Sequence, residues 1–345
     1  SIISFIILML VTLRYNQVMD IGFLVCSNGL GHIRRICLIC KFLVDRGIKV
    51  TIYGEEEKIN FFLDVKYKNI IQIINFDTKT KIYNWLNGTS TEWLKQYPSS
   101  IKKHDKLISD NLLEILEIVP DSIIMASFFW HKTLPVSKKL FKNTETLLNK
   151  YNPTIISAKG FTPRYICAYE KNHQIGLSVE KERIITKFKK NNKQKILISS
   201  GSSTLYDNQI SDLLANFNKN YIKSLSIEHL KIEKKFQNYC SDKIKIFNFT
   251  CSDYRDINIA IIRPSLGVIT ECLAANLIIL PMYEKGNNEI NFNAKQISLM
   301  FDVPIFTSIF DAFKYIDERL IIKSKKPTSF DGPADLYKLL ETNNI

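Results

Sequence analysis

Residues 21–53 read IGFLVCSNGLGHIRRICLICKFLVDRGIKVTIY, and the fold class can be predicted from this stretch. The apolar run 21–26 predicts a buried strand. Residues 33–46 carry apolar side chains at helical spacing up to Gly47, a residue type that commonly ends helices, and a second strand is expected at 49–53. A strand, a helix and a second strand make one βαβ unit, which predicts a parallel sheet covered by helices.

The alternation of strands and helices continues along the chain. The first half has further apolar runs with strand character at 70–74, 106–109, 122–127 and 154–157. Residues 177–195 form a polar, Lys-rich helix or connector, and the pattern restarts at Ile196. The second half predicts strands at 195–199, 243–249, 257–262 and 277–281 and helices at 208–220, 229–239, 267–275 and 291–300.

The length of 345 residues exceeds what one hydrophobic core usually sustains. We therefore predict an α/β protein with two Rossmann-like domains facing each other across a cleft. The expected organisation is an apolar N-terminal extension at 1–18, an N-terminal Rossmann-like domain at 19–176, a linker at 177–194 and a C-terminal Rossmann-like domain at 195–345.

The first residues are almost wholly apolar between positions 2 and 13. About a dozen residues are too few to span a bilayer, which needs around 20. A signal peptide is disfavoured, because the segment lacks a basic start and no small-residue cleavage site follows it. We expect an extension upstream of Met19, and a short hydrophobic tether to a membrane stays open as the alternative.

Charge and cysteine content narrow the class of protein. The net charge is +13, but the lysines are scattered and no stripe of arginines interleaved with aromatics occurs, so a generally basic surface is favoured over a nucleic-acid groove. The seven cysteines lie mostly in apolar runs, which indicates free thiols in a reducing compartment. Cys37 and Cys40 form a C-x-x-C within a predicted helix, where packing is favoured over metal or redox use.

Three loops carry candidate chemistry, and each follows a predicted strand, where open α/β sheets bind ligands. The first is Gly29-Leu30-Gly31-His32, a turn that lets backbone approach a ligand before a helix N-terminus. It does not match the dinucleotide fingerprint, since the third glycine is absent and no acidic residue ends the next strand. His32 is either a base or phosphate donor facing the cleft or a polar cap.

The other two loops belong to the second half. Residues 199–203 read SSGSS, in which hydroxyls and a permissive glycine before a helix would suit a phosphate, although such a turn needs no ligand. Residues 263–271 read RPSLGVITE. There Glu271, placed early in the predicted helix, either complements the helix dipole or accepts the two hydroxyls of a ribose.

Taken in order, these loops resemble the motifs of the GT-B glycosyltransferases, a likeness that covers nearly all of the chain from Met19. The relevant groups are the bacterial enzymes that add N-acetylglucosamine to lipid-linked peptidoglycan precursor and the UDP-glycosyltransferases. The stretch RPSLGVITECLA at 263–274 and the pattern E-x-x-x-N-A at 289–294 are similar to their nucleotide-sugar signature. NGLGHIRR at 28–35 resembles their G-x-G-H loop, and residues 200–202 resemble their G-G-S phosphate loop.

The resemblance implies roles for individual residues. Glu271 would hold the ribose, Ser202 and Ser203 would face the diphosphate, and Glu289 would contact the donated sugar. His32 would lie at the reaction centre, and Asp110, at the end of a strand, would either orient His32 or cap a helix. The implied nucleotide-sugar site comprises Gly29, Gly31, Gly201, Ser202, Ser203, Arg263, Ser265, Gly267, Thr270, Glu271, Glu289 and Asn293.

The sequence departs from the family pattern at two places. The G-G-S loop is Ser-Gly-Ser here, and Ile290 replaces the Gln that usually follows the glutamate and reads the sugar. The donor sugar, the acceptor and the anomeric outcome are therefore left open.

The implied activity is metal-independent transfer of a sugar, with His32 deprotonating an acceptor hydroxyl and no cofactor besides the nucleotide-sugar, most simply a UDP-sugar. The implied acceptor is a glycan, a lipid-linked compound or a small molecule, received by the N-terminal domain with residues 83–97, including Trp85 and Trp93, which equally suit a core. Neither a metal nor nucleic acid is expected. The implied location is the cytoplasm, with weak association at the inner membrane face left open. A nucleotide-sugar hydrolase of the same fold and a noncatalytic nucleotide-sugar-binding protein remain as alternatives.

Overall fold

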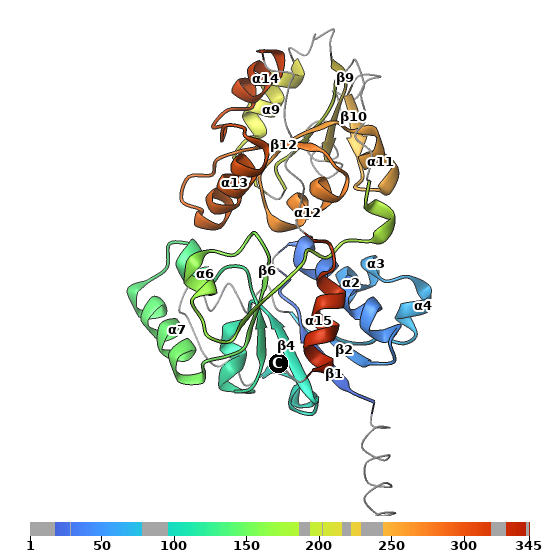
Figure 1. The fold of residues 1–345 in the computed structure, drawn as a ribbon, viewed down its shortest axis with the longest axis vertical. Coiled ribbons are helices and arrows are strands. Elements are labelled where there is room, and N and C mark those ends of the chain that lie inside the picture. The colour runs from blue at the N-terminus through green and yellow to red at the C-terminus, as the bar shows by residue number, and fades with distance from the viewer. Residues whose placement is uncertain are drawn as a thin grey trace, which may run out of the picture. The chain divides into compact units, whose positions relative to one another are not determined.

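The structure is a computed structural model, drawn in Figure 1, that describes residues 18–27, 29–77, 96–185, 194–201, 203–215, 222–228, 244–318, 329–342 and 345. Residues 1–17, Asn28, Ser202 and the predicted helix at 229–239 lie outside the described residues, as do Trp85 and Trp93. The predictions made for them therefore stay predictions.

The first sheet contains seven strands in the order β3-β2-β1-β4-β5-β6-β7. Each strand pairs in parallel with its neighbours where a register is defined. The order reverses direction between β1 and β4, and ligands of open α/β sheets bind beside such a switch point. The strands are β1 Asp20–Leu24, β2 Lys49–Gly54, β3 Gln72–Asn75, β4 Lys106–Asp110, β5 Ile123–Met125, β6 Ile155–Ala158 and β7 Asn172–Ile175.

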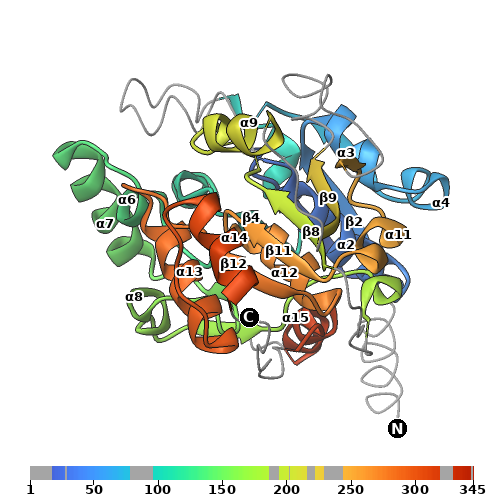
Figure 2. The same cartoon turned by 90° about the horizontal axis from the view of Figure 1, so that it is seen from above.

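The second sheet contains five parallel strands in the order β10-β9-β8-β11-β12. Figure 2 shows β9, β8, β11 and β12 running side by side. The strand at Ile259–Ile262 is wholly apolar and all four of its residues are buried, as expected for a strand covered on both faces. The strands are β8 Gln194–Ser199, β9 Ile222–Glu228, β10 Ile244–Phe247, β11 Ile259–Ile262 and β12 Ile278–Pro281.

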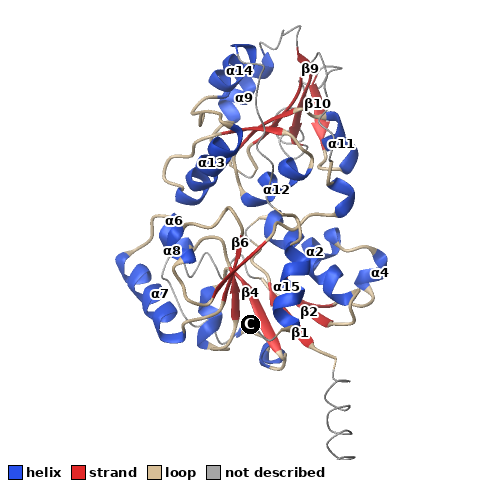
Figure 3. Ribbon diagram, viewed as in Figure 1, coloured by secondary structure: helices blue, strands red, loops and turns tan. Residues whose placement is uncertain are grey.

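Helices connect the strands of both sheets (Figure 3). The α-helices are α2 Leu30–Val44, α3 Glu56–Phe62, α4 Val65–Lys68, α6 Trp130–Thr133, α7 Lys138–Tyr151, α8 Arg164–Cys167, α9 Asp207–Ala215, α11 Cys251–Asp256, α12 Leu266–Ala274, α13 Asn288–Phe301, α14 Ile309–Glu318 and α15 Gly332–Glu341. Short 3-10 helices are η2 Ser99–Lys102, η3 Leu113–Glu117 and η4 Lys181–Arg183.

The chain divides into two compact units. The first unit is Ser1–Met125, Asn143–Thr154 and Tyr337–Ile345, and the second is Ala126–Lys142 and Ile155–Leu336. The strands of the first sheet end at Ile175 and those of the second begin at Gln194, so the predicted linker 177–194 lies between the two sheets. The last nine residues group with the first unit, although the sequence pattern placed them with the second half.

The predicted α/β class and the two parallel sheets are confirmed. Cys37 and Cys40 are buried in α2 as free thiols, and burial raises the pKa of Cys37 to about 12, which fits the packing interpretation. Sequence patterns missed the strands β7 and β9 and the helices α11, α14 and α15. They also started α2 three residues late, at Ile33 instead of Leu30.

Candidate functional site

The first candidate loop follows β1 and leads into α2. Gly29 has φ 101° and ψ 151°, a conformation that a side chain would strain although a Cβ there would meet open space. Gly29 occupies the N-cap position and Gly31 is the second residue of α2, and both are exposed. The loop is thus exposed at the N-terminus of α2, where the first backbone N–H groups have no partner within the helix.

His32 lies on the first turn of α2 and contacts Asp110 at the end of β4. Its Nδ1 is 2.9 Å from Asp110 Oδ2, and the His32 side chain is 18% exposed whereas that of Asp110 is fully buried. The contact arises because β1, which leads to α2, pairs with β4 in the sheet. The helix-cap alternative for Asp110 is wrong, because the following helix η3 has Leu112 at its N-cap.

Arg35, one helical turn after His32, donates a hydrogen bond from Nη2 to Asp110 Oδ1. Burial alone would raise the pKa of Asp110, but the Arg35 and His32 charges and hydrogen bonds outweigh it and lower that pKa. An ionised carboxylate only accepts hydrogen bonds, so His32 Nδ1 donates to it. In the neutral imidazole the proton acceptor is then Nε2.

Glu271 lies on α12 of the second unit. This helix begins at Leu266 with Ser265 at the N-cap, so Glu271 falls in its second turn. The helix-dipole interpretation of Glu271 is therefore wrong, because that effect is confined to the first turn. The carboxylate is 7% exposed and accepts a hydrogen bond of 3.0 Å at Oε2 from Arg183 Nη1.

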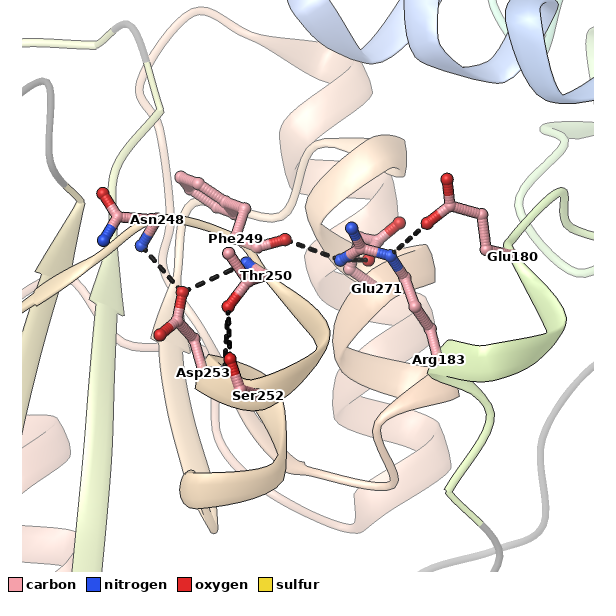
Figure 4. Close-up of polar contacts among 8 residues, drawn as sticks. All are labelled: Glu180, Arg183, Asn248, Phe249, Thr250, Ser252, Asp253 and Glu271. Atoms are coloured by element: carbon pink, nitrogen blue, oxygen red, sulfur yellow. Dashed lines mark hydrogen bonds and ion pairs between the residues drawn. The ribbon is translucent and has the colours of Figure 1, made fainter. Parts of the chain in front are cut away.

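Arg183 ends η4 and ties three segments together (Figure 4). Besides Glu271, its Nη1 donates to the Phe249 carbonyl at 2.7 Å and its Nε donates to Glu180 Oε2 at 2.6 Å. Burial would lower the pKa of Arg183, but the charges of Glu271 and Glu180 outweigh it and raise that pKa. Sequence patterns did not single out Arg183, because it stands in a Lys-rich connector that looks solvated.

The loop between β10 and α11 holds Phe249 in place. Phe249 has φ 59°, an uncommon backbone conformation for a non-glycine residue. Thr250 and Asp253 form a capping box at the start of α11, and Asp253 Oδ2 also accepts from Asn248 N at 3.0 Å. These bonds fix the carbonyl that Arg183 contacts.

The serine loop follows β8. Ser199 and Ser200 are buried, and neither Oγ has a hydrogen-bond partner among the residues that the structure describes. Gly201 has φ 59°, and Ser203 N donates to Ser200 O at 3.3 Å. The predicted diphosphate contact Ser202 lies outside the described residues.

Arg263 begins the third loop, directly after β11. Its backbone N donates to Ser199 O at 2.8 Å, which brings the serine loop and the third loop together at the carboxyl ends of neighbouring strands. Its side chain forms an ion pair with Glu284, a partner that sequence patterns missed. Ser265 precedes α12 and Gly267 is its second residue. The predicted pocket residue Thr270 is buried and donates to its own helix, to Leu266 O at 2.8 Å.

Helix α13 carries Glu289 and Asn293. Asn293 Nδ2 donates to Pro264 O at 3.0 Å, which fixes α13 against the third loop. The isoleucine that replaces the family's Gln, Ile290, is fully buried and cannot read a sugar from there. Glu289 and Asn293 line a pocket within the second unit together with Ser127, Phe128, Thr133, Phe161, Pro163, Tyr165, Leu266, Asn288 and Phe292.

Two features are absent from the described residues. No three His, Cys, Asp or Glu side chains gather there as a metal site would need. None of the helices described is both long and apolar enough to cross a bilayer.

Comparison with solved structures defines the fold. MurG of Acinetobacter baumannii superposes with a TM-score of 0.59 at 13% identity, covering 94% of this chain and 99% of that chain. The spinosyn forosaminyltransferase SpnP gives 0.60 at 10% identity over 95% and 100%, and LpCGTa in complex with UDP gives 0.56 at 12% over 82% and 83%. The chain therefore has the GT-B fold of glycosyltransferases, as its motifs predicted. No protein-family model matches the sequence, and neither does any curated protein.

Proposed function

We propose that this protein is a glycosyltransferase that moves a sugar from a nucleotide-sugar, most simply a UDP-sugar, to an acceptor hydroxyl. One observation carries the proposal. The hydrogen bond from Arg263 N to Ser199 O joins the loop that resembles the phosphate loop to the loop that resembles the nucleotide-sugar signature, at the carboxyl ends of β8 and β11, and α12 leads from there to Glu271. The GT-B fold, shared with a structure that contains UDP, supports the same conclusion.

The second unit is assigned to the donor. The first N–H groups of α12 and the serine loop would receive the diphosphate, since helix N-termini and exposed backbone amides bind anions without a metal. Buried hydroxyls usually have partners, so the Oγ atoms of Ser199 and Ser200 fit a site that a polar ligand completes. Glu271 would accept hydrogen bonds from the ribose hydroxyls.

The first unit is assigned to acceptor activation. Asp110 keeps the proton of His32 on Nδ1, so Nε2 can take the proton of an acceptor hydroxyl. The acceptor oxygen would then form a bond to the anomeric carbon, while the bond from that carbon to the diphosphate oxygen breaks and the nucleoside diphosphate leaves with the electron pair.

The proposal extends to the surroundings of the protein. It needs no divalent metal, so activity should survive EDTA. We propose a cytoplasmic location, in keeping with the free cysteines, and the net charge of +13 is compatible with weak attraction to anionic lipid at the inner membrane face. The acceptor would be a glycan, a lipid-linked compound or a small molecule.

Product analysis tests the proposal. The full chain is incubated with UDP-sugars, with and without candidate acceptors, and sugar products and released UDP are quantified. A glycosylated acceptor supports transfer, and free sugar released equally without acceptor would replace transfer by hydrolysis. Binding with no turnover would indicate a noncatalytic protein. A folded sample whose melting temperature is unmoved by every nucleoside diphosphate would refute the proposal as a whole.

A further inference from the structure

The donor glutamate is not an isolated acceptor in this protein, because an arginine from the connector between the two sheets holds it. Arg183 is 12% exposed, and its Nη1 lies 3.0 Å from Glu271 Oε2. The same nitrogen donates to the Phe249 carbonyl, and Nε donates to Glu180. In Figure 4 the Arg183 side chain extends from η4 toward Phe249 and Glu271.

Anchoring the connector does not by itself require this charged pair. Ile185 N already donates to Ala274 O at 2.7 Å, which fastens the connector to the end of α12 without any buried charge. Removing two charges from water costs free energy that an ion pair recovers only with good geometry and further hydrogen bonds. Arg183 has those bonds, which suggests that the orientation of Glu271 is what the pair provides.

The geometry fixes one of the two carboxylate oxygens. A carboxylate offers about four acceptor positions, and the Arg183 bond uses one of them, at Oε2. The guanidinium is a planar fork and is itself held by Phe249 and Glu180, so it restricts the rotation of the Glu271 carboxylate. A carboxylate oriented before the ligand arrives binds a diol more tightly, because less conformational freedom is lost on binding.

We propose that Arg183 is a positioning residue for the nucleotide-sugar donor, which holds the Glu271 carboxylate in the orientation that accepts the ribose hydroxyls. This inference rests on the proposed function and assigns to the connector segment a part in donor affinity. Arg183 acts through Glu271 and takes no part in the transfer of the sugar.

The test measures UDP affinity by titration calorimetry and donor KM and kcat with the full chain. Arg183→Gln should weaken UDP binding and raise donor KM by about tenfold, the scale of one charge-assisted hydrogen bond, while kcat at saturating donor stays within about threefold. Arg183→Lys, which keeps the charge but lacks the planar fork, should recover part of the affinity. Arg255→Gln, an exposed arginine on α11, is the matched control and should leave both values unchanged.

A double-mutant cycle decides whether Arg183 works through Glu271. The double variant Arg183→Gln, Glu271→Gln should bind UDP no more weakly than Glu271→Gln alone, because the positioned group is already lost. Additive losses, or an Arg183→Lys variant that folds and binds UDP like Arg183→Gln, would overturn the inference. If the wild-type protein binds no nucleoside diphosphate, the proposed function itself fails. If the wild-type protein binds UDP and the Arg183 variants bind it equally well, the inference alone fails.

Discussion

Two buried carboxylates, Asp110 in the first unit and Glu271 in the second, each receive an arginine, yet they are arranged for different tasks. Both oxygens of Asp110 accept hydrogen bonds from side chains, Oδ1 from Arg35 and Oδ2 from His32. Glu271 receives Arg183 at Oε2, and its arginine is shared with a backbone carbonyl. Asp110 is thus suited to act on a neighbouring imidazole, whereas the role we propose for Glu271 is to bind a ligand directly.

An arginine can thus serve either role. At Asp110 the arginine, Arg35, lowers the pKa of the carboxyl against the opposing effect of burial. The ionised carboxylate then keeps His32 in the tautomer with no proton on Nε2. At Glu271 the arginine, Arg183, orients the carboxylate within a network that includes the connector. Variants at each carboxylate should therefore separate turnover from donor affinity.

The largest effect is expected for His32→Ala. Loss of a positioned general base lowers turnover by about 10²- to 10⁴-fold, while UDP affinity, assigned to the second unit, should change little. The measurement is a donor saturation curve with the same acceptor, after circular dichroism shows that the variant is folded. His173→Ala, on β7, is the control. Near-normal turnover would remove the base from the mechanism, and lost donor binding with turnover preserved would make His32 a phosphate ligand.

Asp110→Asn should have the next largest effect. The amide can donate as well as accept, so it no longer forces the proton onto His32 Nδ1, and a fraction of the imidazole would then present a protonated Nε2. We expect turnover to fall by about 10²-fold with UDP affinity unchanged. The exposed Asp121→Asn is the matched control. If turnover of Asp110→Asn stays within a few-fold of wild type, His32 needs no control of its tautomer, and Asp110 does not act through His32.

The sequence predicted the α/β fold, and its resemblance to the GT-B enzymes gave Asp110 as either a partner of His32 or a helix cap. The structure shows the contact with His32, although 78 positions separate the two residues. The sequence missed the partners that set the electrostatics. Arg35 could have been found, because residues three apart share a helix face. Arg183 and Glu284 could not have been found, because no local sequence pattern shows which charged residue of one loop contacts a charged residue far away in the sequence. The strand β9 was missed because lysine and serine interrupt its apolar residues.

A third buried carboxyl, Glu114 on η3, differs from Asp110 and Glu271 because its hydrogen-bond partner is a neutral side chain, Tyr97. The Tyr97 hydroxyl donates to Glu114 Oε1 at 3.3 Å, and burial raises the pKa of Glu114 to about 7. The pKa shifts of Asp110 and Glu114 have opposite signs, so the two acids change the stability of the fold in opposite directions as pH rises. Asp110 contributes stability above its unfolded pKa of about 3.9, which is lost as pH falls, whereas Glu114 reduces stability as pH rises from about 4.3 toward 7.

Glu114→Gln should therefore remove the decline in stability between about pH 4.5 and 7. The shift in the pKa of Glu114 corresponds to roughly 3 kcal/mol, so above pH 7 the variant should be more stable than wild type by up to that amount. Urea unfolding at pH 5 and pH 8 measures it, with the exposed Glu117→Gln as control. A variant no more stable than wild type at pH 8 would mean that ionising the buried Glu114 costs little free energy. The absence of a cationic partner among the described residues would then not set Glu114 apart from Asp110.

The smallest of these effects is expected for Glu271→Gln, which keeps the size of the side chain but replaces charge-assisted hydrogen bonds to the ribose by neutral ones. The loss should be roughly 1.5 to 3 kcal/mol, or at least about tenfold in the Kd for UDP, with kcat at saturating donor nearly retained. Calorimetry gives the Kd, and the thermal shift at one UDP concentration should shrink accordingly. Glu182→Gln, an exposed neighbour of Arg183 on η4, controls for the change in net charge. Because the amide also leaves Arg183 with only one of its two carboxylate partners, Glu180, unfolding without ligand is measured alongside, so that lost stability is not counted as lost affinity. An unchanged Kd in a folded Glu271→Gln would show that this carboxylate serves only to hold Arg183, and the two buried acids would then differ in their partners but not in their use.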